Sequence, residues 1–357
     1  MSRQGLIEHD GPDVVVDGVR RYDVPCEPPW WARGGHAQTV LGHFLPSRGE
    51  RMKRASFDTF ELDLEGDDRI LVFRSAGTTG VRVHLFHGLS GDVNSEYMRR
   101  TASVLRAAGH DVWAVNHRGS GEGWQLAREP YHSGKYQDMQ SVLQASREDA
   151  PDRIRVVVGF SLSGNQGLLL GADPGAAPPH GIVAINPPAD LARASNDIGR
   201  GFNRAYEMRF MRRLKKTVRD RRRLGFSDRD GAEVRAGMSL CEFDDRFTAP
   251  ECGFESGADY YARSSGGTRL DGVRVPTVIV TAEDDPFVDP HIYRELPRSE
   301  HVFLHVERSG GHVGYVSRDT GLTERWLDGA ILHYVEELST LARSELPAST
   351  GEKGTAS

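Results

Sequence analysis

A serine, a group of acidic residues and a histidine occur in that order along a chain of 357 residues, and each follows an apolar run rich in β-branched side chains. The serine is Ser161, the acidic residues are Glu283, Asp284 and Asp285, and the histidine is His312. A serine that attacks an acyl carbon needs a base that takes its proton and an acid that orients this base. These residue types therefore indicate nucleophilic acyl transfer by a Ser-His-Asp triad.

Two of the three acidic residues are suited to the acid's role. We favour Asp285, because Pro286 after it bends the chain away and leaves the carboxylate free to turn toward His312. Asp284 is the alternative. Glu283 is less suitable because it lies closer to the preceding strand.

The surroundings of the serine are typical of a tight strand-to-helix turn. Residues 153–158 predict a buried strand and residues 166–171 the first turns of a helix, with Ser161 between them. Such a turn strains the serine backbone and leaves room only for very small residues two positions before and after it. Gly159 fits this requirement, whereas Ser163 stands where glycine is usual, and we expect the turn to form with serine there. Strings of the form G-x-S also arise by chance, so Ser161 alone does not establish a site.

Two backbone N–H groups are candidates for binding the oxyanion that forms during acyl transfer. One belongs to Leu162, directly after the serine. The other belongs to Leu89, in the glycine-containing loop 87–91 that follows the predicted strand 81–86.

The histidine lies in a loop that gives its ring room to reach across to the serine. His312 belongs to the glycine-rich segment 309–314 after the last predicted strand, 301–306, and none of the other thirteen histidines has this setting. The alternative interpretation is an exposed loop histidine.

No pair of histidines has the spacing of metal ligands beside a carboxylate, so we expect no metal.

A second glycine-rich loop raises the possibility of a nucleotide cofactor. Three glycines in residues 116–123 follow the predicted strand 111–115, but Trp124 stands where the G-x-G-x-x-G fingerprint requires glycine. We therefore expect no cofactor.

Strands alternate with helices over most of the chain, which predicts an α/β fold with a doubly wound, mostly parallel sheet. An antiparallel hairpin at residues 57–64 and 69–73 is expected at one edge of the sheet. The parallel strands are expected at residues 81–86, 111–115, 153–158, 181–185, 276–281 and 301–306. The carboxyl ends of parallel strands share one edge, so the serine, the acids and the histidine are expected to converge there.

The alternation is interrupted once, and this sets the predicted domains. Residues 187–272 are interpreted as an inserted helical cap, and residues 56–186 and 273–343 as the core. Residues 1–55 are expected to pack near the site entrance, and residues 344–357 to form a disordered tail.

The cap contains a strongly basic helix, predicted at residues 204–224. The simpler interpretation is the solvated outer face of a lid. The alternative is peripheral contact between residues 209–223 and an anionic membrane.

The N-terminal segment also has two interpretations. Either Trp30 and Trp31 pack a lid, or His36 or Gln38 lines a substrate entrance.

Composition excludes several classes of protein. A net charge of −6 argues against nucleic-acid binding. The three cysteines, Cys26, Cys241 and Cys252, lack C-x-x-C spacing, which fits a reduced cytoplasmic protein without disulfides or zinc. We expect neither a secretory signal nor a membrane span, because the N-terminus lacks an apolar region and no apolar run reaches about 18 residues.

Taken together, these stretches resemble the YheT-like branch of the α/β-hydrolases, which includes plant embryogenesis-associated proteins and animal abhydrolase-domain lipases. The matching stretches are Trp31 with 35–39, 87–91, 116–119, 131–134, 159–165, 242–244, 260–261, 284–287 and 310–314. The departures are Ser163 in place of glycine and Ala37 where leucine is common.

The resemblance implies an α/β-hydrolase fold and a serine hydrolase of carboxylic esters, with the triad at Ser161, Asp285 and His312. The expected substrate is a small-molecule or lipid ester. An alcohol O-acyltransferase that uses the same serine is one alternative, and a non-catalytic binding protein on a hydrolase scaffold is another.

Overall fold

The structure is a computed structural model that describes residues 18–345. Its centre is an eight-stranded sheet with the strand order β1-β2-β4-β3-β5-β6-β7-β8. The strands are β1 (Asp58–Asp63), β2 (Arg69–Ser75), β3 (Val81–Phe86), β4 (Asp111–Val115), β5 (Ile154–Phe160), β6 (Gly181–Ile185), β7 (Thr277–Ala282) and β8 (Val302–Glu307). β2 pairs antiparallel with both β1 and β4, and all the other pairs are parallel.

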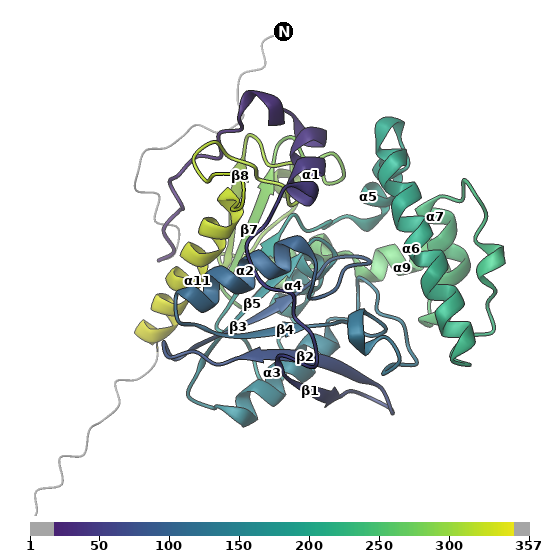
Figure 1. Cartoon of the computed structure of the whole chain (residues 1–357), viewed down its shortest axis with the longest axis horizontal. Coiled ribbons are helices and arrows are strands. Elements are labelled where there is room, and N and C mark those ends of the chain that lie inside the picture. Colours follow the sequence, from purple (N-terminus) through teal and green to yellow (C-terminus); the bar gives the residue numbers. More distant parts are fainter. Residues whose placement is uncertain (1–17, 346–357) are drawn as a thin grey trace, which may run out of the picture.

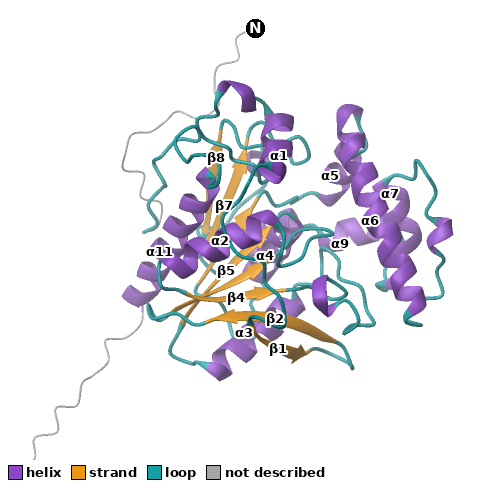
Figure 2. Cartoon of the chain, in the orientation of Figure 1, coloured by secondary structure: helices purple, strands orange, loops and turns teal. Residues whose placement is uncertain are grey.

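The helices form layers on both faces of this sheet and a separate group beside it (Figures 1 and 2). They are α1 (Gly35–Phe44), α2 (Glu96–Ala107), α3 (Gln137–Asp149), α4 (Leu162–Ala172), α5 (Leu191–Ile198), α6 (Arg204–Arg223), α7 (Leu240–Phe243), α8 (Ala249–Glu251), α9 (Gly257–Ser264), α10 (Ile292–Glu295) and α11 (Trp326–Glu345). The expected α/β fold with a mostly parallel sheet is therefore confirmed.

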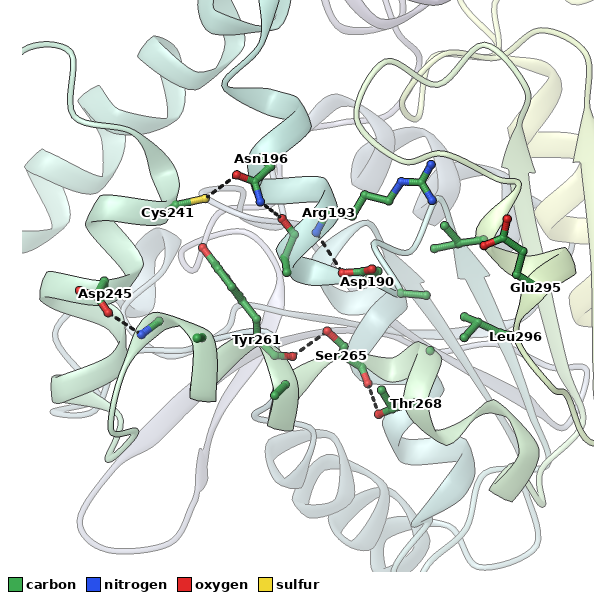
Figure 3. Close-up of a pocket in the computed structure, with 17 residues that line it drawn as sticks. Asp190, Arg193, Asn196, Cys241, Asp245, Tyr261, Ser265, Thr268, Glu295 and Leu296 are labelled. Carbon is green, nitrogen blue, oxygen red and sulfur yellow. Dashed lines mark hydrogen bonds between the residues drawn. The ribbon is translucent and has the colours of Figure 1, made fainter.

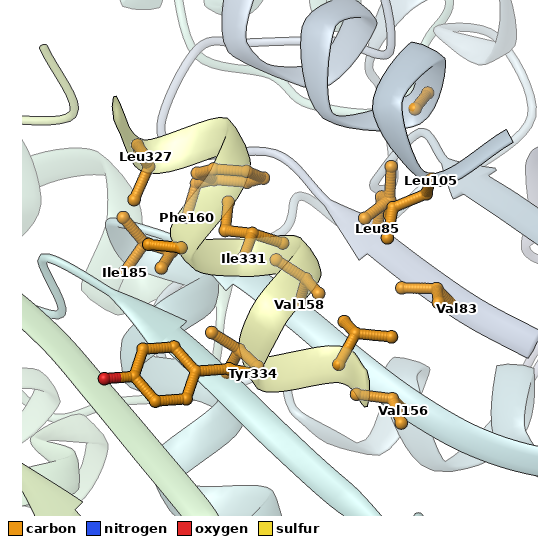
Figure 4. Close-up of a cluster of buried hydrophobic side chains, with 14 of the residues drawn as sticks. Val83, Leu85, Leu105, Val156, Val158, Phe160, Ile185, Leu327, Ile331 and Tyr334 are labelled. Carbon is orange, nitrogen blue, oxygen red and sulfur yellow. The ribbon is translucent and has the colours of Figure 1, made fainter. Parts of the chain in front are cut away.

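The central strand β5 shows how the two faces are filled. Its side chains point alternately to opposite faces, so Val156 and Val158 pack toward α2 and α11, whereas Val157 packs toward α3 and α4. Figure 4 shows the first of these clusters, with Ile331 and Leu327 of α11 lying over the strand residues. β5 has no polar side chain apart from Arg155, as expected for a strand buried on both faces.

Residues 187–272 contain α5 to α9 and no strand, and most of these helices lie to one side of the sheet (right in Figure 1). They have an apolar cluster of their own. It consists of Met211, Val218, Val234, Met238, Phe243 and Phe247. The basic helix has the predicted extent to within one residue. None of the helices formed by residues 18–345 is long and apolar enough to cross a membrane.

The ends of the chain differ in part from the expectation. Residues 1–17 and 346–357 lie outside the described residues, whereas residues 344 and 345 belong to α11. Helix α1 was not predicted, because adjacent glycines such as those at positions 34 and 35 are typical of loops. A Cβ at Gly35 would lie 1.6 Å from the Asp284 carbonyl oxygen, so this glycine serves close packing.

Candidate active site

Ser161 occupies a strained turn between β5 and α4. Its φ of 53° and ψ of −114° lie outside the regions that L-residues usually adopt. Gly159 is required by sterics, because an added Cβ would lie 2.3 Å from the carbonyl oxygen of Ser163. The backbone N–H of Ser161 donates to Ile185 O of the neighbouring strand β6 at 2.7 Å. The turn therefore forms with serine at position 163, as expected.

The side chains of Ser161, His312 and Asp285 form one hydrogen-bonded row. Nε2 of His312 lies 2.8 Å from Oγ of Ser161, and its Nδ1 lies 2.9 Å from Oδ2 of Asp285. The Asp285 side chain is fully buried and that of His312 is 13% exposed. The three residues follow the carboxyl ends of β5, β7 and β8, so the sheet brings together residues that are up to 151 positions apart.

The Asp285 carboxylate is held by three further donors. Oδ1 accepts the backbone N–H groups of Phe287 at 2.9 Å and Val288 at 3.1 Å. Oδ2 accepts Nδ2 of Asn186 at 2.7 Å. Asn186 follows β6 with a φ of 43°, a conformation that asparagine tolerates better than most residues, and the sequence analysis did not identify it. The carboxylate is thus fixed at both oxygens, and Oδ2 is shared between Asn186 and His312.

Asp284 has a different set of contacts. Its carboxylate accepts Oγ–H of Ser309 at 2.9 Å and the backbone N–H groups of Gly310 and Gly311 at 2.8 Å each. The N–H of Glu283 donates to Glu307 O and continues the pairing of β7 with β8. Of the three acids, Asp285 contacts His312, while Asp284 holds the loop that carries it.

The two candidate oxyanion donors lie beside the serine. Within residues 18–345, the N–H groups of Leu89 and Leu162 have no intramolecular acceptor. The loop of Leu89 approaches closely, since a Cβ at Gly88 would lie 3.2 Å from Cβ of Ser161. Tyr131 OH accepts the N–H of Ser90 at 2.6 Å and holds this loop.

The hydroxyl of Ser163, the departure from the usual turn, lies in a buried hydrogen-bond network. Its Oγ donates to the carbonyl of His87 at 2.5 Å, so it accepts Nε2–H of His117 at 2.6 Å. Burial, followed by the nearby His87, lowers the pKa of His117 well below its ordinary value, so this ring is neutral. The ring of Tyr131 stacks on His117 at 5.0 Å. Ser163 therefore connects the serine turn to the Leu89 loop.

Helix α1 supports the loop that carries His312. Oγ1 of Thr39 accepts the N–H of His312 at 2.9 Å, and Gln38 exchanges two hydrogen bonds with the backbone of Val316. A Cβ at Gly42 would lie 2.4 Å from Cα of Gly314, so the two backbones are in direct contact. Gln38 is fully buried, and the prediction that it lines an entrance is wrong.

A row of aromatic contacts runs from His312 to the surface. Phe287 lies 4.8 Å from the ring of His312 and 4.8 Å from that of Tyr206 in α6. Tyr206 stacks on His36 at 5.8 Å, and His36 meets the edge of Phe202, which is 65% exposed. His36 thus packs among these aromatic rings, and its place at a substrate entrance stays a prediction.

A pocket of about 700 Å³ lies elsewhere, between α5, α9 and α10 (Figure 3). Its polar lining includes Asp190, Arg193, Asp245 and Glu295. None of the three residues of the hydrogen-bonded row lines it, so this pocket is separate from the candidate site. Among the described residues, no three His, Cys, Asp or Glu side chains are grouped so that they could hold a metal ion.

Comparison with known families identifies the family of the chain. A model of the alpha/beta hydrolase family matches residues 85–325. The chain belongs to the α/β hydrolase family. The matched region includes all three residues of the row and the loop of Leu89.

Named relatives refine this α/β hydrolase assignment. The chain is 30% identical to the putative esterase YheT of Escherichia coli over 259 residues, which cover 70% of this chain and 75% of the relative. This confirms the resemblance to the YheT-like branch. It is also 24% identical to the medium-chain fatty acid ethyl ester synthase/esterase 2 of Saccharomyces cerevisiae, over 72% of this chain and 62% of that protein.

A solved esterase structure shares the architecture. The esterase Pf2001 of Pyrococcus furiosus superposes with a TM-score of 0.54 at 14% identity, covering 84% of this chain and 98% of the esterase. At this identity the likeness supports the fold alone.

Proposed function

We propose that this α/β hydrolase is a serine hydrolase that cleaves carboxylic esters through an acyl-enzyme intermediate. The observation that carries the proposal is the unbroken row Ser161–His312–Asp285, with distances of 2.8 Å and 2.9 Å. The name of the YheT relative, a putative esterase, supports the same class of reaction.

Each member of the row has a distinct role in the proposed reaction. Nδ1–H of His312 donates to Asp285, which leaves Nε2 as the acceptor that faces Ser161. Nε2 takes the serine proton as Oγ attacks the acyl carbonyl, and later gives it to the departing alcohol. Asp285 holds the ring in this tautomer and stabilises the imidazolium that forms. A water then attacks the acyl-enzyme by the same proton transfers.

The N–H groups of Leu89 and Leu162 are the proposed donors to the tetrahedral oxyanion. Both lack intramolecular acceptors within the described residues, so no protein hydrogen bond has to break before they bind it. Each such donor is worth about 3 kcal/mol of the barrier in enzymes of this kind.

Hydrolysis of p-nitrophenyl esters with acyl chains of two to sixteen carbons tests the proposal. Ser161→Ala should lower kcat at least about 10³-fold, and a fluorophosphonate probe should label the wild-type protein at Ser161. The control is Ser141→Ala, whose hydroxyl lies on α3 and, among residues 18–345, bonds only to Gln137 O. Equal hydrolysis by wild type and Ser161→Ala would overturn the proposed nucleophile. Absence of both labelling and hydrolysis would favour the non-catalytic binding protein.

An O-acyltransferase is the second candidate, and the name of the yeast relative, a synthase/esterase, favours considering it. An alcohol would then attack the acyl-enzyme in place of water. Product analysis with added ethanol separates the two activities, since a transferase forms the ethyl ester faster than the free acid.

Contact between residues 209–223 and an anionic membrane stays a prediction. Several basic side chains of α6 are already paired with carboxylates, which reduces the charge that is available. These pairs are Lys216 and Arg223 with Asp220, Arg221 with Glu251, and Arg222 with Asp230. Sedimentation with anionic vesicles at low and high salt tests the contact, which requires binding that falls as salt rises.

A further inference from the structure

Two arginines on successive turns of the cap helix α6 point toward the body of the protein, beside the candidate site. Nη1 of Arg213 donates to the carbonyl of Ser90 at 3.0 Å. Nη2 of Arg209 donates to Nε2 of His43 in α1 at 2.5 Å. Residues four apart share one face of a helix, so both guanidinium groups lie on the side of α6 that faces the core.

Neither arginine is neutralised by the protein. Within residues 18–345, the side chains of Arg209 and Arg213 form no ion pair with a carboxylate. Arg213 contacts the carbonyl of Ser90, and Arg209 contacts the imidazole of His43 and the ring of Phe44, 5.5 Å from its centroid. Burial, then Arg209 and Arg213, lowers the pKa of His43, so this ring adds no positive charge near neutral pH.

The acidic groups on the facing segment form no ion pair with Arg209 or Arg213 among the described residues. Glu96 of α2 pairs with Arg99 and accepts the hydroxyl of Ser47. Asp92, in the loop before α2, accepts the backbone N–H of Asn94 at 2.8 Å. Two guanidinium groups that have no ion-pair partner among the described residues therefore lie close together, and burial, then Arg213, lowers the pKa of Arg209. An anion bound between them would relieve this repulsion.

The position of Arg213 connects this charge to the proposed reaction. Its partner Ser90 directly follows Leu89, the proposed oxyanion donor, in the loop whose Gly88 approaches Ser161. The Arg213 side chain is exposed, and one of its N–H groups is accounted for by Ser90. Its remaining donors have no hydrogen-bond acceptor within the part of the chain that the structure describes, and they can bind a carboxylate or a phosphate in a bidentate manner.

We propose that Arg213 and Arg209 form a subsite for an anionic group of the ester substrate, a carboxylate or a phosphate. This inference rests on the proposed esterase function and narrows its substrate class to esters that carry a negative charge near the scissile bond. Neutral esters are poorer substrates because they leave the two guanidinium groups without a counter-ion.

Two soluble esters that differ by one phosphate provide the test: 1-hexanoylglycerol and 1-hexanoylglycerol 3-phosphate, with release of hexanoate as the readout for both. The wild-type protein should prefer the phosphate ester in kcat/KM by about tenfold, the size expected for charge-assisted hydrogen bonds at a partly exposed site. Arg213→Gln should remove most of this preference, and Arg213→Lys should restore part of it. Arg212→Gln is the matched control, since Arg212 is an exposed neighbour on the same helix.

The outcomes separate this inference from the function on which it rests. No preference in the wild type, or a preference that Arg213→Gln leaves intact, overturns the subsite while hydrolysis itself stands. Failure to release hexanoate from either ester overturns the proposed function. Glycerol 3-phosphate should also inhibit cleavage of the neutral ester competitively, and this inhibition should weaken in Arg213→Gln.

A third arm distinguishes an anion on the substrate from one on a lipid surface. A long-chain neutral ester is presented in vesicles with and without anionic lipid. If the effect of Arg213→Gln appears only with anionic vesicles and is absent with the soluble phosphate ester, the arginines bind a membrane headgroup, and the substrate subsite is overturned.

Discussion

Oδ2 of Asp285 lies 2.9 Å from Nδ1 of His312, and the adjacent Asp284 instead binds the backbone of the loop that carries this histidine. Two consecutive carboxylates thus serve one imidazole in different ways. One contacts the ring directly, and the other fixes the backbone that presents the ring.

This division predicts different effects for two similar substitutions. Asp285→Asn should lower kcat by about 10³- to 10⁴-fold, because an amide no longer stabilises the imidazolium or enforces its tautomer. Asp284→Asn keeps an oxygen for the N–H groups of Gly310 and Gly311 and should keep kcat within about tenfold of wild type. The measurement is steady-state hydrolysis of a p-nitrophenyl ester. A larger loss in Asp284→Asn would reverse our assignment of the acid.

The second prediction concerns the buried hydroxyl of Ser163. Ser163→Ala leaves Nε2–H of His117 without an acceptor and should lower the free energy of unfolding by about 1–3 kcal/mol. It should also lower kcat, because the Leu89 loop loses its connection to the serine turn. Urea denaturation and steady-state kinetics measure the two effects.

A double-mutant cycle tests this explanation. Adding His117→Phe to Ser163→Ala removes the unpaired donor, so the double variant should be more stable than the sum of the single effects predicts. Additive losses would mean that the two side chains are not coupled.

The third prediction concerns the backbone contact between α1 and the loop of His312. Gly→Ala inside a helix normally stabilises by up to about 1 kcal/mol. Gly42→Ala should instead destabilise and lower kcat, because its Cβ would lie 2.4 Å from Cα of Gly314. Gly272→Ala is the control, since its nearest atom would be at 4.0 Å. Thermal unfolding distinguishes the two, and equal melting temperatures would argue against the tight contact.

The fourth prediction concerns the pH dependence of stability through Asp244, in the helical segment 187–272. Burial raises the pKa of Asp244 from 3.8 to about 6, although it accepts hydrogen bonds from Thr248 and Tyr261. The folded protein therefore binds this proton more tightly than the unfolded chain does. The resulting stabilisation is fully present below pH 4 or so and is lost as the pH rises through about 6.

Asp244→Asn removes this titration. The variant should gain stability relative to wild type between pH 4 and pH 8, by an amount on the order of 2 kcal/mol. Melting temperatures of both proteins across this range provide the measurement, and titrations common to the two proteins cancel. A difference that stays constant with pH would contradict the raised pKa.

Several features of the fold and site could be predicted from local sequence. β5 is short, apolar and β-branched, so its burial on both faces follows from its composition. The convergence of Ser161, Asp285 and His312 could be predicted because each follows the end of a strand. The carboxyl ends of parallel strands share one edge of the sheet. Each of these predictions used only the residues that lie next to the feature in the chain.

Other features depend on contacts between distant segments and left no local signal. The glycines of α1 resembled loop residues, because their packing partners, Asp284 and Gly314, lie far away in the sequence. Asn186 follows β6 like any loop residue, and its bond to Asp285 appears only when β6 and β7 are adjacent. The departure at Ser163 was visible, but its partner His117 was not, since nothing in the spacing connects them.

The packing of α1 under the loop of His312 has a consequence for folding. The contacts of Thr39 with His312 and of Gln38 with Val316 span more than 270 positions. During synthesis, α1 leaves the ribosome long before its partner loop exists, and contacts of such high sequence separation form late and slowly. A nascent chain can therefore assemble most of its sheet while His312 is still unsupported. The contacts between α1 and this loop can form only after the loop has been made, and they hold the backbone that carries the histidine.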